Sequence, residues 1–327
     1  MDSLLIDRPA AARPGSLSSP AVPAGPPALY AERIQVEAGA FSFAAREVAF
    51  RSGVATAIIG PNGAGKSTLL EALLGLRRAR VDHARILGVP AARFLRDAAQ
   101  ARRLGVQLQR VEYPDGARVR EILDLHRALY RRQDAGVATA LAIGELADRP
   151  YAGLSKGQRQ RLDLFIALAH CPELAVLDEP FTGLDRSASR SVLALLHRHL
   201  AGLTVAMICH AAEELDAVED LIWVRDGGIR YHGPKAGLKH AMVGDFRARL
   251  RLDDPVRLRQ VQQALTSDPR IRRVVRPTPG EILVFGAAGL DRRIHGLVGD
   301  GPIRLFEFAA SDDGDLLRAC TRGEDDA

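Results

Sequence analysis

The chain has 327 residues, of which 47% are hydrophobic and 26% are charged. That length allows one large domain with a small one, and that composition excludes a fibrous protein and a chain disordered throughout. The net charge of +5 comes without a long basic run and the three cysteines lie far apart, so we expect neither a nucleic-acid partner nor a disulfide framework.

The first 28 residues are rich in Pro, Ala, Ser and Gly and indicate a disordered tail over 1–28. Residues 29–244 then alternate apolar runs of strand length with longer stretches that suit helices. This alternation predicts an α/β domain whose mostly parallel sheet is covered by helices. No stretch approaches the length of a transmembrane helix, so we expect no membrane span. The expected strands are Val54–Ile59, Leu174–Leu177, Leu203–Cys209 and Leu221–Val224.

A glycine-rich loop follows the first of these strands and precedes the helical stretch LLEALLGL. Its pattern, GxxxxGK[ST], lets backbone N–H groups point inward around phosphate oxygens, and the next helix adds its positive N-terminal end. We expect Lys66 to reach the β- and γ-phosphates of a nucleotide, and the Ser67 hydroxyl to hold Mg²⁺. The nucleotide-binding residues expected here are Gly60, Pro61, Asn62, Gly63, Ala64, Gly65, Lys66, Ser67 and Thr68.

A second turn, LSKGQ, opens a long amphipathic helix and also suits an anion. Ser155 is a good N-cap, and Gly157 keeps the first helical turn uncrowded. Taken alone, the turn suits an ordinary capped helix equally well.

Two acids, Asp178 and Glu179, directly follow the apolar strand Leu174–Leu177. Ligands of open α/β sheets bind at the carboxyl ends of strands, where these acids are expected. We expect Asp178 to hold Mg²⁺ opposite Ser67, and Glu179 to take a proton from an attacking water. An isolated Asp-Glu pair would indicate a turn or a helix start, but the glycine-rich loop favours a site.

The pattern of residues 245–310 differs from that of the large domain. Strand-like and helix-like stretches follow in the order β-α-β-β-α-β, which predicts a small α+β, ferredoxin-like domain. The stretch 311–327 is acidic and is expected to be a tail. The role of 245–327 stays open between regulation, a dimer contact and a contact with a membrane partner. The expected elements are the strands Phe246–Leu252, Ile271–Arg276, Ile282–Phe285 and Ile303–Phe308, and the helices Val256–Leu265 and Leu290–Val298.

Together these motifs resemble those of the ATP-binding cassette (ABC) ATPases. LSKGQ resembles the family signature LSGGQ, with Lys156 at its variable position, and the resemblance assigns Ser155, Gly157 and Gln158 to nucleotide binding. The glycine-rich loop resembles Walker A, and the strand with its two acids resembles Walker B. The fold this implies is a P-loop NTPase cassette with a helical signature subdomain.

Three further residues take their expected roles from the resemblance alone. Gln109 fits the Q-loop, which implies a contact to Mg²⁺. Gln107, two residues earlier, is the alternative, but the spacing of four residues between Gly105 and Gln109 favours Gln109. Asp185 fits the D-loop, which assigns it to nucleotide binding, and His210 fits the switch histidine. The catalytic residues implied are Glu179, His210, Lys66 and Gln109, and the metal ligands implied are Ser67, Asp178 and Gln109.

The resemblance implies a subunit that binds and hydrolyses ATP with Mg²⁺ to drive transport. Two copies would enclose two ATP molecules head to tail, and a separate transmembrane permease would hold the pair at the inner face of the membrane, so that the chain is cytoplasmic and peripheral. Within the family, GVQLQ and YPDGARVREIL resemble drug-, antibiotic- and polysaccharide-export ATPases, which suggests an exporter.

Two questions stay open at the level of sequence. The aromatic residue that stacks on adenine in this family has no clear match, and Phe41 and Phe43 are the candidates. The alternative function is a soluble ABC ATPase acting on nucleic acid or the ribosome. The stretch between Lys66 and Asp178 shows no sustained heptads, which disfavours the DNA-repair members of the family.

Overall fold

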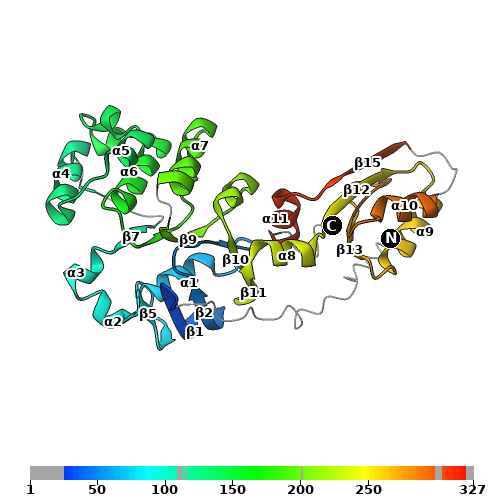
Figure 1. Ribbon diagram of the computed structural model, residues 1–327, viewed down its shortest axis with the longest axis horizontal. Helices are drawn as coiled ribbons and strands as arrows, with labels where there is room; N and C mark the ends of the chain where they lie inside the picture. The colour runs from blue at the N-terminus through cyan, green and yellow to red at the C-terminus, as the bar shows by residue number, and fades with distance from the viewer. Residues whose placement is uncertain (1–25, 109–112, 115, 200–201, 299–303, 322–327) are drawn as a thin grey trace. The chain divides into compact units, whose positions relative to one another are not determined.

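The computed structural model describes residues 26–108, 113–114, 116–199, 202–298 and 304–321. The described residues divide into two compact units, 26–232 and 233–321 (Figure 1). The second unit therefore begins at Gly233 rather than at the expected 245. The reason is the helix α8 (Lys235–Met242), which packs with the later part of the chain: Lys235 and Lys239 both pair with Asp313, at 2.8 and 3.4 Å.

The first unit is built on a mixed sheet. Its strands run in the order β6-β5-β1-β2-β11-β10-β3-β9-β8-β7, with β4 added beside β1. The segment β10-β3-β9-β8-β7 is parallel, as the alternating sequence pattern predicts. Its strands are β3 (Ala55–Ile59), β7 (Leu104–Gln107), β8 (Leu174–Leu177), β9 (Thr204–Ile208) and β10 (Asp220–Arg225), so the four expected strands are confirmed within about two residues.

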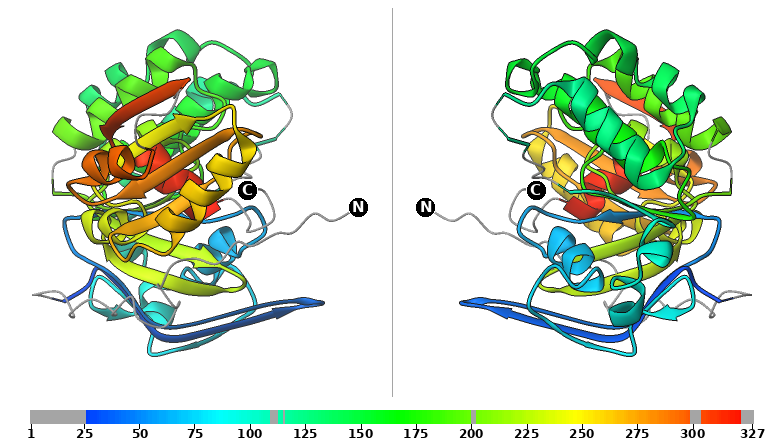
Figure 2. Two further views of the ribbon diagram at one scale, coloured as in Figure 1. Left: turned by 90° about the vertical axis from the view of Figure 1, so that its right-hand side faces the viewer. Right: turned by 90° about the vertical axis from the view of Figure 1, so that its left-hand side faces the viewer.

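The antiparallel part of this sheet was not predicted. The strands β1 (Leu29–Ala38) and β2 (Phe41–Phe50) pair over their whole length and form a long ribbon (Figure 2). Their inward residues alternate with exposed polar ones, and such half-exposed strands lack the continuous apolar run that marks a buried strand. The remaining strands are β4 (Arg80–Asp82), β5 (Arg85–Ile86), β6 (Val89–Pro90) and β11 (Gly228–Pro234).

Helices surround the parallel strands and form a helical region between β7 and β8. The core of the unit packs Leu69, Leu70 and Leu73 of α1 against the sheet residues Ile58 and Val176. None of the described helices is long and apolar enough to cross a bilayer. The helices are α1 (Lys66–Leu73), α2 (Ala91–Phe94), α3 (Ala98–Ala101), α4 (Val119–Tyr130), α5 (Ala135–Ala140), α6 (Lys156–Leu168) and α7 (Arg186–Ala194). Short 3₁₀ helices lie at Ile143–Leu146, Tyr151–Gly153 and Ala212–Ala217, and a π-helical segment follows α7 at Leu195–His199.

The second unit contains an antiparallel sheet of order β13-β14-β12-β15. Its elements follow as β-α-β-β-α-β, in agreement with the expected ferredoxin-like order. Apolar side chains of α9 and α10, among them Leu258, Val261 and Ile294, pack on Ala248 and Leu250 of the sheet. The elements are β12 (Phe246–Arg251), α9 (Pro255–Thr266), β13 (Ile271–Val275), β14 (Glu281–Gly286), α10 (Leu290–Val298), β15 (Leu305–Ala310) and α11 (Asp313–Thr321).

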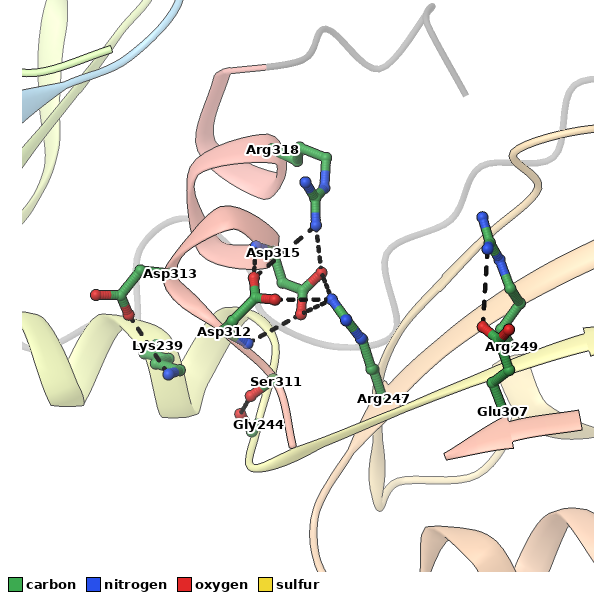
Figure 3. Close-up of polar contacts among 10 residues, drawn as sticks. All are labelled: Lys239, Gly244, Arg247, Arg249, Glu307, Ser311, Asp312, Asp313, Asp315 and Arg318. Atoms are coloured by element: carbon green, nitrogen blue, oxygen red, sulfur yellow. Dashed lines mark hydrogen bonds and ion pairs between the residues drawn. The ribbon is translucent and has the colours of Figure 1, made fainter. Parts of the chain in front are cut away.

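The expectation of an acidic tail is wrong for α11. Its acids do not face solvent freely: Arg247 of β12 binds Asp312 at 3.0 Å and Asp315 at 2.9 Å, and Arg318 binds Asp315 at 2.6 Å (Figure 3). On its other side α11 buries Leu316 and Cys320. The cluster of acids therefore belongs to an ordered helix rather than to a tail, because Arg247 of β12 and Arg318 of α11 pair with these acids. The rest of the expected tail, 322–327, lies outside the described residues.

Candidate functional site

Three loops meet at one edge of the parallel sheet. The strands β3, β9 and β8 are direct neighbours and run parallel, so their carboxyl ends lie side by side. The glycine-rich loop follows β3, His210 follows β9, and Asp178 with Glu179 follows β8. The structure thus brings together residues that are more than 100 positions apart in the chain.

The glycine-rich loop depends on its glycines where the backbone is most crowded. Gly60 has φ 148°, and a Cβ at this position would lie 1.9 Å from the carbonyl oxygen of Val224. Gly65 has φ 107° and is the N-cap residue of α1, which has no side-chain cap and no acid in its first turn. No side chain therefore caps the backbone N–H groups at the start of α1, which agrees with the expectation that they bind a phosphate.

Lys66 lies folded over this loop. Its Nζ donates to the carbonyl oxygens of Gly60 and Pro61, both at 3.0 Å, and its residue is only 7% exposed. Burial lowers the pKa of Lys66, while the charges of Glu179 and Asp178 oppose that shift. A cation held this way at the open end of α1 suits phosphate oxygens.

Asp178 is buried and carries an unsatisfied oxygen. Its side chain is hydrogen-bonded to Ser67, and burial, the largest effect, raises the pKa of the carboxyl. Its Oδ1 has no hydrogen-bond partner among the described residues. A buried carboxylate oxygen beside a hydroxyl matches the hard oxygen ligands that Mg²⁺ prefers, so these two residues fit the metal. The described chain contains no group of three His, Cys, Asp or Glu residues that would compete as a metal centre.

Glu179 is held in a strained conformation that directs its carboxylate. Its φ is 53°, which is uncommon for a residue with a side chain. Its Oε1 lies 3.0 Å from Nε2 of His210, and its Oε2 accepts a hydrogen bond from Oγ1 of Thr182 at 3.0 Å. The structure thus pairs Glu179 with His210, the residue that fits the switch histidine.

Gln160, which the motifs did not single out, supports this conformation from α6. Its Nε2 donates to the carbonyl oxygens of Glu179 at 3.2 Å and Pro180 at 2.9 Å. Thr182 was likewise not predicted. Gln160 and Thr182 each hydrogen-bond to Glu179, and these contacts form only once the chain is folded. A glutamine within a helix or a threonine in a turn gives no sequence signal of such a contact.

The residues of the LSKGQ turn have structural partners within one chain. Ser155 caps α6: its Oγ accepts from the Gln158 N–H at 3.3 Å, and the Ser155 N–H donates to Oε1 of Gln158 at 3.0 Å. A Cβ on Gly157 would lie 2.6 Å from the carbonyl oxygen of Gly183, so the turn touches the loop before α7. Asp185 caps α7 in the same way as Ser155 caps α6. Their assignment to nucleotide binding stays a prediction.

Gln109 lies outside the described residues. Gln107 is described: it is buried at the end of β7, and its Nε2 donates to the carbonyl oxygen of Asp178 at 3.1 Å. Its amide therefore ties β7 to the strand that carries the two acids.

The two aromatic candidates differ in accessibility. Phe41 and Phe43 lie on the same face of β2, and both rings come within about 3 Å of a Cβ built on Gly65. Phe43 is 1% exposed and belongs to the core, whereas Phe41 is only partly buried. Phe41 is therefore the more accessible of the two candidates.

A partly buried acid on α6, Asp163, makes stability depend on pH. Burial raises the pKa of Asp163 to about 7, against the opposing charge of Arg159, and its Oδ1 has no partner among the described residues. A carboxyl whose folded pKa is raised stabilises the fold at low pH, and this contribution is lost as pH rises from the unfolded value near 4 through 7.

We therefore expect Asp163→Asn to raise the midpoint of thermal unfolding by about 3 °C or more at pH 8, with a smaller effect at pH 5. Calorimetry at both pH values measures this difference. The matched control is Asp124→Asn, at an exposed position on α4, which should be neutral at both. An equal effect of Asp163→Asn at pH 5 and pH 8 would contradict the titration.

Sequence comparisons identify relatives of the chain. A family profile described as ABC transporter matches residues 45–182. The cobalt import ATP-binding protein CbiO of Rhodobacter capsulatus is 34% identical over 202 residues, which cover 58% of this chain and 72% of that protein. The molybdenum import ATP-binding protein ModC of the same species is 34% identical over 192 residues, covering 56% and 53%. The Nod factor export ATP-binding protein I of Rhizobium meliloti is 33% identical over 196 residues, covering 58% and 57%.

Solved structures agree on the fold. An ATP-binding subunit of an ABC transporter superposes with a TM-score of 0.58 at 22% identity, covering 65% of this chain and 92% of the other. The cassette MJ0796, solved as a dimer in a post-hydrolysis state with ADP and Pi, gives a TM-score of 0.53 at 21% identity, covering 63% and 98%. The similar part in each case is about two thirds of the chain, as expected for a cassette with an added C-terminal unit.

Proposed function

Because the chain belongs to the ABC family of transporter ATP-binding subunits, which bind ATP with Mg²⁺ and hydrolyse it, we propose that the site described above is its ATPase centre. The observation that carries the proposal is the convergence of Lys66, Asp178 and Glu179 at one sheet edge, with Glu179 paired to His210. ATP is the substrate of this enzyme class and Mg²⁺ its cofactor. Bound Mg²⁺ would neutralise charge on the phosphates, held by Ser67 and Asp178.

Each residue has a separate part in the proposed reaction. Lys66 and the N–H groups at the start of α1 bind the phosphates and stabilise the charge that develops on them. The Glu179 carboxylate takes a proton from the attacking water, and His210 orients that carboxylate across 3.0 Å. Gln160 and Thr182 keep the carboxylate in place, and the partly buried ring of Phe41 stacks on the adenine.

We propose that two copies pair head to tail, with Ser155 and Gly157 of one facing the glycine-rich loop of the other. The N-terminal end of α6 that Ser155 caps supports this, since it adds a second positive helix end for one nucleotide. Gln109 is proposed to link the Mg²⁺ site to the membrane partner. Asp185, at the start of α7, is proposed to lie at the same dimer contact.

The expected export subgroup is not supported by the relatives, because most of them, CbiO and ModC included, carry import names, and the Nod factor protein carries an export name at a similar identity. We therefore propose transport by a complex with a transmembrane permease without assigning a direction. A cytoplasmic position at the inner face of the membrane follows from that partner.

An exposed apolar patch supports a membrane-bound partner. Leu76, just after α1, is 61% exposed and Leu95, just after α2, is 41% exposed. The two lie close together, since Leu95 Cδ1 is 3.6 Å from a Cβ built on Gly75. Exposed apolar side chains that gather on one surface commonly mark a protein contact. A hollow beside them is lined by Pro90, Ala92, Arg93, Arg96 and Asp97.

We expect Leu95→Glu to release the chain from membranes, because it places a charge in an apolar contact. In fractionated cells, the share that sediments with membranes should fall about tenfold, while ATP hydrolysis by the purified variant stays unchanged. The matched control is Val256→Glu, at an exposed apolar position on α9, which should stay on the membrane. Recovery of the native chain only with ribosomes or nucleic acid would overturn the transport proposal in favour of the alternative function.

A further inference from the structure

The strand β15 is an edge of the C-terminal sheet. Among the described strands it pairs only with β12, and Figures 1 and 2 show its other side open within this unit. Its sequence, LFEFAA, has neither Lys nor Pro, the residues that usually protect an exposed edge from pairing. Its only charge, Glu307, lies 3.7 Å from Arg249 of the neighbouring strand, which also pairs with Glu281 (Figure 3).

The register with β12 fixes which backbone groups of β15 face outward. The Ser311 N–H donates to the Asp245 carbonyl oxygen at 2.9 Å, and these two residues continue the β12–β15 pairing. Backbone groups alternate along an antiparallel strand. Residues 307 and 309 therefore turn their N–H and C=O groups to β12, whereas Phe306, Phe308 and Ala310 turn theirs to the open edge.

A second copy of the same strand satisfies this edge. Paired antiparallel about a two-fold axis centred on Phe308, the outward groups of Phe306, Phe308 and Ala310 meet those of Ala310, Phe308 and Phe306 in the other copy, forming about six hydrogen bonds. This register sets Glu307 opposite Ala309. The neighbouring register, centred on Glu307, would set two like charges opposite each other, which is unfavourable.

The aromatic side chains support the same register. Phe308 is 39% exposed, and its ring stacks on Phe246 of β12 with centroids 5.2 Å apart. Two copies paired at Phe308 would continue this stack across the joint, with Phe308 rings directly opposite and a Phe246 ring on either side. Cross-strand aromatic pairs of this kind stabilise a sheet.

We propose that β15 pairs with β15 of a second copy of this chain, joining the two C-terminal sheets into one continuous sheet. The side chains favour a second copy, because Phe308 would meet Phe308 and Glu307, which shares Arg249 with Glu281, would meet only Ala309 across the axis. The contact uses no residue of the ATPase site. It therefore forms without nucleotide, unlike the head-to-tail pairing proposed above.

The test is the oligomeric state of the full chain without nucleotide or Mg²⁺, so that its outcome does not depend on the proposed ATPase function. In sedimentation velocity at about 1–100 µM, the native chain should dimerise, and Phe308→Lys should weaken dimerisation at least about tenfold. The control Val256→Lys, at an exposed apolar position on α9, should dimerise as the native chain does. A native chain that is monomeric throughout, or an unchanged Phe308→Lys variant, overturns the proposal.

Cysteine cross-linking tests the register in chains that keep the native fold. Phe308→Cys should form a symmetric disulfide, since residues opposite each other in this register have Cα atoms about 5.5 Å apart. Val256→Cys and the native chain should not cross-link. Efficient cross-linking of Glu307→Cys alone would contradict the Phe308-centred pairing.

Discussion

The substitution Glu179→Gln is expected to leave ATP binding intact and to lower the rate of hydrolysis by about 10²–10⁴-fold, the usual contribution of a general base. Glutamine keeps the size of the side chain and the hydrogen bond from Thr182, but it has no proton affinity to draw a proton from water. Because hydrolysis is slowed after binding, the variant should also accumulate as an ATP-bound dimer.

Two measurements on the purified chain check this result. Phosphate release gives the rate, and titration with ATP and Mg²⁺ gives the affinity. Glu173→Gln is the matched control: this glutamate lies just before β8, pairs with Arg103 on the surface and should leave both values unchanged. Steady hydrolysis by Glu179→Gln near the native rate would overturn the assignment of the base.

The parallel half of the fold was predictable because its strands are buried on both faces. Leu174–Leu177 is a continuous apolar run, and the acids that follow it mark a strand end. The ribbon of β1 and β2 was not predictable in the same way, since polar residues on its exposed face interrupt the apolar pattern. The C-terminal order was predictable from period and turn signals, but α11 was not, because Arg247, which pairs with Asp312 and Asp315, lies on β12 far away in the sequence.

The grouping of the site was predictable where the expected ligand dictates the residue type. Lys66, Ser67, Asp178 and Glu179 have side chains of the types that phosphate, metal and water require, and the structure brings them to one sheet edge. The residue type at Gln160 is not dictated by a ligand. Its amide donates to the carbonyl oxygens of Glu179 and Pro180, and a backbone carbonyl accepts from many donors. Residues that position a catalytic group through backbone contacts become visible only in the folded chain.

The second large effect is expected at Lys66, and its argument begins with composition. The chain has 45 Lys and Arg residues, yet only Lys66, Lys156, Lys235 and Lys239 are lysines. Arginine is thus the ordinary base of this chain, and an exception needs a local reason. At Lys66 the reason is space: the residue is 7% exposed, and its Nζ fits between the carbonyl oxygens of Gly60 and Pro61 at 3.0 Å each.

We therefore expect Lys66→Arg to fail almost as completely as Lys66→Ala. The planar guanidinium keeps the charge but is too large for that gap, so it cannot take the place of a compact ammonium at the phosphates. Loss of a charged hydrogen bond, about 1.5–3 kcal/mol, predicts a dissociation constant for ATP about 10–100-fold higher in both variants. Fluorescence titration with a labelled nucleotide measures it, and Lys239→Arg, which keeps a cation near Asp313 on the second unit, serves as the control with native affinity. Native affinity of Lys66→Arg would show that charge alone suffices at this position, and that the fit of Lys66 to the loop is not what selects lysine.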